Sequence, residues 1–339
     1  MKYRYIWLFV FVILLSFCGC SRKSFGMIDS FETININRFD SALFSWIEAD
    51  DPIILAEIRK DYPIMLEMLG KALFKNDFLI NDTDSSVFFD YLINYFSEPT
   101  LKTLYKDAIT YYSADFSRIH QIEEELSHGF ASLKKQFPSM QIPAVYMHVS
   151  GLQQNMIVAD SLISCSIDKY LGSDYPLYKE FLYDYQYKSM VPERIAKDCF
   201  NVWLKSEYPF NGKDNELLDR MIYEGKIIYI ITQTGNNYKY QNITSLTDDE
   251  YKWCLEYESA LWTTIIERKH LYTPDAATTS KYFQPSPSVF ISEKAPGFLG
   301  SFIGYRIVER YMKQTKSTCE ELINNKDAQD ILSKSKYKP

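Results

Sequence analysis

The chain has 339 residues, of which 46% are hydrophobic and 16% aromatic, so it is long enough for one large core or two small ones. Its formal net charge is −7, and the absence of a Lys/Arg cluster disfavours a nucleic-acid partner. Gly and Pro are sparse, at 12 and 13 residues, and the sequence has no repeat or low-complexity tract. This composition favours a helix-rich globular protein.

The N-terminus has the pattern of a secretory signal. Lys2 and Arg4 precede an apolar run over 6–18, which is too short to span a bilayer comfortably and fits the apolar region of a signal peptide. An ordinary secretory signal or a single anchoring helix would also begin in this way.

The end of the apolar run resembles a lipobox, the processing site of bacterial lipoproteins. Gly19 is the small residue expected before a lipidated cysteine, here Cys20, although Phe17 is bulkier than the usual aliphatic residue at its position. Cys18 is a weaker candidate because Phe17 directly precedes it. The lipobox therefore favours Cys20 as the first residue of the mature protein.

We predict a signal peptide over 1–19, an acylated Cys20 and a polar tether over 20–30. Several acyl chains would hold the protein on a membrane without a spanning helix. Ser21 is not the Asp that retains enterobacterial lipoproteins at the inner membrane, and no acidic export run follows it. The expected location is therefore the outer membrane, facing the periplasm.

The first folded part, 31–140, is predicted to be helical. Apolar residues recur there every three to four positions, and Pro63 and Pro99 mark helix boundaries. The predicted helices cover 36–46, 53–74 (divided at Pro63), 87–96, 101–111 and 115–138.

A small sheet is predicted within 141–170. Apolar and polar side chains alternate from Ala144 to Val149, and a second stretch of strand character follows and runs to Asp168. We expect three or four antiparallel strands near 143–168.

The last part, 175–335, is again predicted to be helical, with helices over 192–207, 214–233, 248–269 and 297–314. Thr247 is a plausible N-cap for the third of these. The segment 272–297 contains four Pro and is predicted to be a loop without regular helix. Helices, a small sheet and further helices predict an α+β, mainly helical fold with a single globular domain over 31–339.

The stretch DRMIYEGKIIYI, residues 219–230, raises the question of a zinc site. In one group of zinc peptidases a helical glutamate, such as Glu224, is the third ligand, and the first two are the histidines of an HExxH helix. The predicted helix before Glu224, 192–207, contains no His. The sequence therefore predicts no zinc site and no cofactor. The four histidines of the chain are His120, His128, His148 and His270.

Other catalytic patterns are weak. His120, Glu124 and His128 share one helix face, but positions i and i+8 lie about 12 Å apart, so the three cannot bind one ion. Glu124 and His128 can form half a site, although a solvated helix face is the simpler interpretation. No GxSxG nucleophile motif occurs, and no catalytic residue is predicted.

The four cysteines beyond the anchor are widely spaced and form no CxxC motif. Most of them lie in apolar contexts, so buried free thiols are the favoured interpretation over disulfides or metal ligands. These residues are Cys165, Cys199, Cys254 and Cys319.

The predicted helix 297–314 carries small residues at GxxG and GxxxG spacing. Such spacing occurs in membrane helices, but Arg306 and two further charged residues in its second half argue against one. We expect this helix to pack closely against another helix, and Gly225 to mark a close helix contact. We also expect Glu224 to be a buried carboxylate held by Arg306 or by a Tyr hydroxyl.

Six segments together resemble the GldB gliding-motility lipoprotein family of Bacteroidetes. In chain order they are INRFDSALF, DKYLGSDYPLY, VPERIAKDCFNVWL, LLDRMIYEGKIIYI, YKWCLEYESALW and APGFLGSFIGYRIVERYM. The resemblance implies an envelope lipoprotein associated with gliding and with the linked type IX secretion machinery. Motility itself need not follow, because members also occur in species that do not glide.

Two of these segments are also similar to gluzincin-type peptidases. Glu224 and Gly225 fall on an EG motif of that group, and Gly304, Tyr305 and Arg306 fall on a later GYR motif. The HExxH motif has no counterpart, and the two residues after Gly225 depart from the group's small-residue pattern. The resemblance implies a degenerate gluzincin-like (zincin) scaffold with a relict cleft around Glu224, Gly225, Tyr305 and Arg306.

The expected function is that of a non-catalytic envelope lipoprotein, a pseudo-peptidase. Its expected partners are the lipid membrane, through acylated Cys20, and other envelope, gliding or secretion proteins. Two alternatives remain open: a metallopeptidase-like enzyme with an unusual site, and a peptide- or glycan-binding module that uses the relict cleft.

Overall fold

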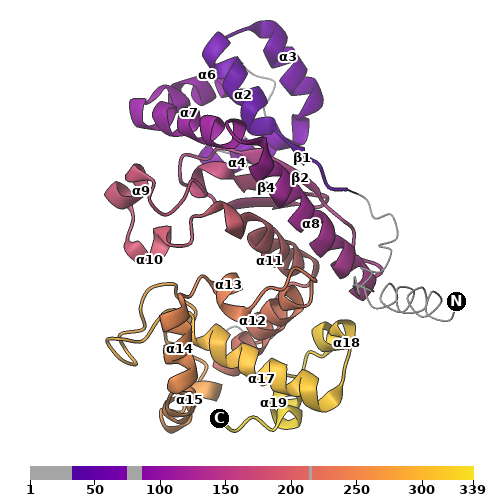
Figure 1. Ribbon diagram of the computed structural model, residues 1–339, viewed down its shortest axis with the longest axis vertical. Helices are drawn as coiled ribbons and strands as arrows, with labels where there is room; N and C mark the ends of the chain where they lie inside the picture. The colour runs from indigo at the N-terminus through magenta and orange to yellow at the C-terminus, as the bar shows by residue number, and fades with distance from the viewer. Residues whose placement is uncertain (1–32, 75–85, 214–215) are drawn as a thin grey trace, which may run out of the picture. The chain divides into compact units, whose positions relative to one another are not determined.

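The computed structural model describes residues 33–74, 86–213 and 216–339. The predicted signal peptide, Cys20 and the tether lie outside these residues. Helices make up most of the described chain and surround one small sheet, which confirms the α+β, mainly helical class (Figure 1). Of the helices in the described ranges, none has both the length and the apolar character that crossing a bilayer requires.

The predicted N-terminal helices are confirmed with small changes at their ends. Asp51 caps α3 by accepting a hydrogen bond from the Ile53 amide, and a Pro begins each of α3, α4 and α7, where no intrahelical amide donor is needed. The helices are α2 (Phe39–Ala49), α3 (Pro52–Asp61), α4 (Pro63–Phe74), α6 (Ser86–Ser97), α7 (Pro99–Ser113) and α8 (Phe116–Gln136). Residues 36 and 37, predicted to be helical, form a strand instead.

The sheet is mixed, so the prediction of an antiparallel sheet was wrong. Its strands are β1 (Ile36–Asn37), β2 (Ala144–His148), β3 (Met156–Ala159) and β4 (Leu162–Ser166), in the order β1-β2-β4-β3. Only the β3–β4 hairpin is antiparallel; β2 pairs with both β1 and β4 in parallel. The reason is topological: the chain leaves β2, forms β3 at the edge, and returns as β4 between them.

The C-terminal part contains more helices than the four predicted ones, and two of the differences have a local cause. The predicted helix 248–269 is divided at Tyr257, whose ring stacks on Trp253. The Pro-containing loop includes a short helix, α16 (Ala276–Lys281), because the Asp275 carboxylate caps the amides of Ala277 and Thr278. The prediction of Thr247 as an N-cap is confirmed.

The remaining helices are α9 (Pro176–Phe181), α10 (Asp184–Tyr187), α11 (Ile195–Glu207), α12 (Leu217–Thr232), α13 (Tyr240–Thr244), α14 (Asp248–Glu256), α15 (Glu258–Glu267), α17 (Leu299–Thr315), α18 (Cys319–Asn324) and α19 (Ala328–Ser335). Short 3-10 turns lie at Ile167–Lys169, where the predicted strand ends early, at Pro192–Arg194, and at His270–Tyr272.

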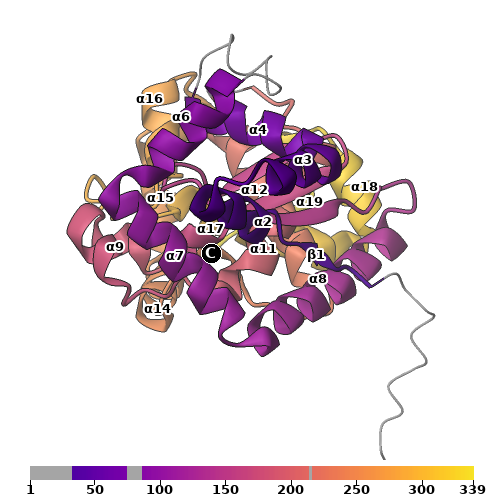
Figure 2. The same ribbon diagram turned by 90° about the horizontal axis from the view of Figure 1, so that it is seen from above.

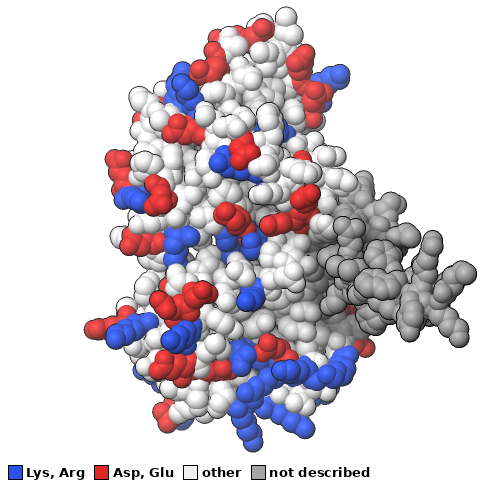
Figure 3. Space-filling view, viewed as in Figure 1, with Lys and Arg blue, Asp and Glu red and all other residues white. Residues whose placement is uncertain are grey.

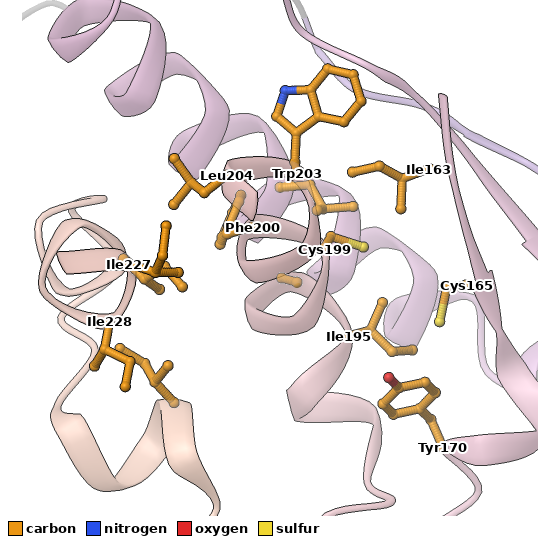
Figure 4. Close-up of a cluster of buried hydrophobic side chains, with 14 of the residues drawn as sticks. Ile163, Cys165, Tyr170, Ile195, Cys199, Phe200, Trp203, Leu204, Ile227 and Ile228 are labelled. Atoms are coloured by element: carbon orange, nitrogen blue, oxygen red, sulfur yellow. The ribbon is translucent and has the colours of Figure 1, made fainter. Parts of the chain in front are cut away.

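Helix α11 packs between the sheet and α12. In Figure 4, Ile195 and Cys199 lie on the side of Ile163 and Cys165 of the sheet, while Leu204 lies toward Ile227 of α12. Helices α2 to α7 lie on the other side of the sheet (Figures 1 and 2), whereas α8 packs against α11, where the ring centroids of Phe130 and Phe200 are 5.0 Å apart. Two layers of apolar contact therefore hold α11, and only a narrow face of this helix remains for polar residues.

The four cysteines of the described residues are free thiols, as predicted. Cys165, Cys199 and Cys254 are buried, whereas Cys319 is half-buried. Burial raises the pKa of the Cys165 and Cys199 thiols well above the usual value, because the apolar interior disfavours the thiolate.

Two glycines bring α12 and α17 into backbone contact, which confirms the predicted close packing of both helices. A Cβ added at Gly304 would overlap the carbonyl oxygen of Met221, and one added at Gly225 would overlap the Gly304 carbonyl. Both residues are buried. Because the contact is between backbones, no side-chain rearrangement can make room for a methyl group at either position.

Replacing Gly304 by Ala is expected to destabilise the protein by about 1–3 kcal/mol, because the helices must separate to admit the methyl group. Helix propensity alone would give the opposite sign, a gain of about 1 kcal/mol. Urea unfolding measures the change, with Lys313→Ala on the exposed side of the same helix as the control. A stabilised Gly304→Ala variant would contradict the contact.

Candidate functional site

A cleft of about 690 Å³ lies beside the edge of the sheet. One wall is formed by residues 153–156, which lead into β3, and by Lys169 and Tyr170, which follow β4. Helices α11 and α12 and the segments around α10 and α13 line the rest of the cleft. Its volume is within the range of small-molecule and peptide sites.

The polar face of α11 lines this cleft. Asp198, Asn201, Val202 and Lys205 are spaced i, i+3, i+4 and i+7, so they share one side of the helix. Sequence analysis did not single them out, although their spacing against the apolar side of the same helix was a readable signal. The helix in which a zinc peptidase would carry its histidines thus presents an amide, a carboxylate and an ammonium.

Glu224 also lines the cleft, but its partner is not the predicted one. The two carboxylate oxygens lie 3.0 and 2.9 Å from the Nζ of Lys205. The Glu224 side chain is 19% exposed and that of Lys205 is 34% exposed. Glu224 is therefore a partly exposed carboxylate paired across the cleft with α11, and the prediction of a buried pair with Arg306 was wrong.

Arg306 lies in a separate network, centred on the buried carboxylate of Glu258. Its Nε donates to both carboxylate oxygens of Glu258, at 3.1 and 3.2 Å, and the Tyr337 hydroxyl donates to the same carboxylate at 2.8 Å. A second guanidinium nitrogen donates to Glu309 at 2.6 Å. This network joins α15, α17 and the C-terminal segment.

The four residues predicted to form one relict cleft are thus divided. Glu224 lines the cleft, and Gly225 belongs to the helix contact with α17. The backbone of Tyr305 takes part in that contact, and its ring lies 5.0 Å from that of Tyr240. Arg306 points to Glu258 instead.

Charges in the cleft are mostly paired. The guanidinium of Arg194 donates to Asp198, which also accepts from the Tyr170 hydroxyl at 2.9 Å, and Lys188 pairs with Glu250 at 2.7 Å. Lys169 differs: its Nζ donates to the Leu152 carbonyl at 3.1 Å. Within the described part of the chain, no carboxylate lies within ion-pair distance of it.

Figure 3 shows acidic and basic side chains mixed over one face of the molecule. Lys169 differs from these surface charges because it is half-buried and lies at the wall of the cleft. Burial lowers the pKa of Lys169, and the nearby Asp168 opposes that shift. Because no carboxylate of the described residues pairs with it, the Lys169 ammonium is available to an anionic group that enters the cleft.

A buried carboxylate fixes the loop that enters β3. Asp168 is fully buried and accepts hydrogen bonds from the amides of Ser150, at 3.2 Å, and Leu152, at 2.6 Å, and from the Ser166 hydroxyl. Leu152 has a φ of +65°, a left-handed conformation that is rare for a leucine. The carboxylate therefore compensates a strained turn at residues 150–152, from which the chain enters the cleft wall.

His148 lies buried in the neighbouring strand, β2. Its Nδ1 is 2.7 Å from the Ser164 hydroxyl, and its Nε2 has no hydrogen-bond partner among the described residues. Burial lowers the pKa of His148 to about 3, since the protonated ring would be charged in an apolar interior. His148 is therefore a neutral core residue.

The half-site predicted from Glu124 and His128 is a solvated helix face. Glu124 lies 3.3 Å from His120 instead, and their side chains are 60% and 70% exposed. His128 is exposed on the same helix. Across 33–74, 86–213 and 216–339, no three His, Cys, Asp or Glu side chains stand close enough together to hold a metal ion.

Removing the carboxylate of the Glu224–Lys205 pair and that of the Glu258–Arg306 pair should lower the free energy of unfolding by different amounts. Glu224→Gln is expected to lower the free energy of unfolding by less than about 1 kcal/mol, because water reaches both partners. Glu258→Gln is expected to cost about 3 kcal/mol, because the Glu258 carboxylate is buried and its loss leaves the Arg306 Nε and the Tyr337 hydroxyl without their charged acceptor. Urea unfolding of both variants, with a double-mutant cycle between Glu224 and Lys205, measures the difference. Equal costs would refute the assignment of partners.

His148 predicts a pH dependence of stability. The unfolded histidine takes up a proton near pH 6.5, whereas the folded one does so only near pH 3. Between these values the unfolded state binds more protons, so stability falls as the pH falls, by up to about 1.4 kcal/mol per pH unit. His148→Asn should remove this slope, and His120→Asn, on the exposed helix face, should keep it. An unchanged slope in His148→Asn would contradict the prediction.

The chain was compared with protein families, curated proteins and solved structures. The family described as gliding motility protein GldB matches residues 27–339. No curated protein and no solved structure matches the chain. The family match includes all the described residues, the cleft and both glycines of the helix contact among them. The chain therefore belongs to the GldB gliding-motility family, which associates it with gliding motility and the cell envelope.

Proposed function

We propose that the protein is a non-catalytic lipoprotein of the cell envelope that supports gliding or the linked type IX secretion machinery through protein-protein contacts. Acyl chains on Cys20 would anchor it, at the outer membrane and facing the periplasm. Family membership supports the association with gliding, and the lipobox supports the anchor.

The ion pair between Lys205 and Glu224 is the observation that supports a non-catalytic role. In a zinc peptidase, a carboxylate at the position of Glu224 would bind the metal. Here the Lys205 ammonium donates hydrogen bonds to both oxygens of Glu224. Lys205 lies on α11, the helix on which the first two zinc ligands of such a peptidase would be expected. The lysine thus supplies the positive charge that a metal ion would otherwise bring, and the carboxylate has no remaining charge to satisfy.

The charged groups of the cleft are also poorly suited to a nucleophilic site. The Asp198 carboxylate accepts a hydrogen bond from Arg194 on one oxygen and from the Tyr170 hydroxyl on the other. These contacts hold Asp198 in an ion pair, whereas a general base must stand within hydrogen-bond reach of the water or hydroxyl that it activates. A surface that binds a partner needs no such group, and the cleft offers amide, hydroxyl and charged side chains for contact.

Crosslinking in cells fed an alkyne-bearing fatty acid tests both parts of the proposal. Wild-type protein should carry the label, fractionate with the outer membrane and crosslink to other envelope proteins. Cys20→Ser should lose the label and the membrane association, because the acylated atom is gone. Cys18→Ser is the matched control and should keep both.

A label that persists in Cys20→Ser would overturn the anchor. Repeated recovery of the protein alone would overturn the role in protein contacts. Stoichiometric zinc, lost together with peptidase activity in Glu224→Ala, would overturn the non-catalytic assignment in favour of an enzyme with an unusual site.

A further inference from the structure

The outer edge of the sheet has unpaired hydrogen-bonding groups. β3 is the last strand in the order β1-β2-β4-β3, so β4 pairs with one side of it only. The Ser166 amide donates to the Asn155 carbonyl at 2.9 Å, and Ile157 stands opposite Ser164. Because hydrogen-bonded and non-hydrogen-bonded pairs alternate, the N–H and C=O groups of Met156 and Val158 point away from β4.

These groups have no partner in the part of the chain that the structure describes. No backbone hydrogen bond to Met156 or Val158 occurs there on the side away from β4. Both residues are half-buried. Edge-strand backbone groups without a protein partner are a template for another strand.

The edge continues into the cleft. Met156 lines the cleft together with the three residues before it. Asp168 fixes the turn before that segment through the Ser150 and Leu152 amides, and pairing with β4 fixes β3 itself before any ligand arrives. Such preorganisation lowers the entropy lost on binding.

Lys169 gives the template a direction. Met156 pairs with Cys165 near the end of β4, and Lys169 follows shortly after, so the ammonium stands at the Met156 end of β3. One of its three N–H donors binds the Leu152 carbonyl, which leaves two. A strand added antiparallel to β3 would bring its carboxyl end here, whereas a parallel strand would bring its amino end and repel the ammonium.

We propose that the cleft binds an extended peptide segment as a strand antiparallel to β3, with a carboxylate of the segment beside Lys169. This inference rests on the proposed function, because it gives the chemistry of the partner at that site. The carboxylate is either the end of the partner chain or an Asp or Glu side chain near that end. β3 has four residues and offers two outward pairs of groups, so side-chain contacts in the cleft must supply the rest of the affinity.

Two synthetic pools of random decapeptides test the inference on the full-length protein in detergent. One pool has a free C-terminal carboxylate and the other a C-terminal amide. Affinity selection followed by mass spectrometry identifies the peptides that bind. Enrichment in the first pool alone would show that the carboxylate beside Lys169 is the end of the peptide chain. Enrichment in both pools, with Asp or Glu at one position, would show that it is a side chain. Either result supports the proposal.

Matched variants then locate the enriched peptide. Val158→Pro removes an outward N–H and should weaken binding by about tenfold or more, whereas Val158→Ala keeps the N–H and should bind normally. Lys169→Gln should weaken binding by about tenfold, and Lys313→Gln, at an exposed site on α17, should not. Hydrogen exchange gives a reading that does not depend on the folding of variants: the Met156 and Val158 amides of the wild type should slow when the peptide is bound.

No enrichment from either pool would overturn the inference, as would a bound peptide that leaves the exchange of both amides unchanged. Binding of a chitin hexamer without binding of peptides would assign the cleft to a glycan and would also overturn it. Crosslinking to envelope proteins without peptide binding would refute only this inference, since the partner would then dock elsewhere. Peptide binding without any envelope partner would refute the proposed function instead.

Discussion

The backbone contact between α12 and α17 is the constraint on which the candidate site depends. Gly225 must face α17, because only a residue without a side chain allows the two backbones to approach so closely. Successive helical residues are turned by about 100° (3.6 residues per turn), so Glu224 cannot face α17 as well. It faces α11 and meets Lys205.

The same contact explains the position of Arg306. Gly304 lies against the Met221 carbonyl, and Arg306, two residues later, is turned to the far side of α17. There it meets Glu258 and, through Glu258, Tyr337 near the end of the chain. The two glycines thus orient Glu224 and Arg306 into separate charged networks. One network faces the cleft, and the other binds the C-terminal segment through Tyr337.

Sequence analysis predicted the local structure more fully than the site. Helical periodicity and Pro positions located most helices, because each signal lies within a few residues of its effect. The parallel pairing of β2 with β4 was missed, because β3 comes between them in the sequence but lies at the edge of the sheet, and no local pattern marks this order. Close packing at Gly225 was predicted, because glycine weakens a helix and is retained where a second backbone must come close. The partner of Glu224 was not predicted, because Lys205 lies on another helix and the rotation of the two helices about their axes is a tertiary property.

The buried thiols have a consequence for the proposed location of the protein in an oxidising compartment. Cys165 on β4 and Cys199 on α11 stand in the layer between the sheet and α11, and both hold their protons firmly. A protonated thiol without solvent access reacts slowly with disulfides and oxidants. The folded state therefore protects both sulfurs, and they become reactive only when the layer opens. The rate at which a thiol reagent modifies them is a measure of how often α11 separates from the sheet, the motion that would deform the cleft.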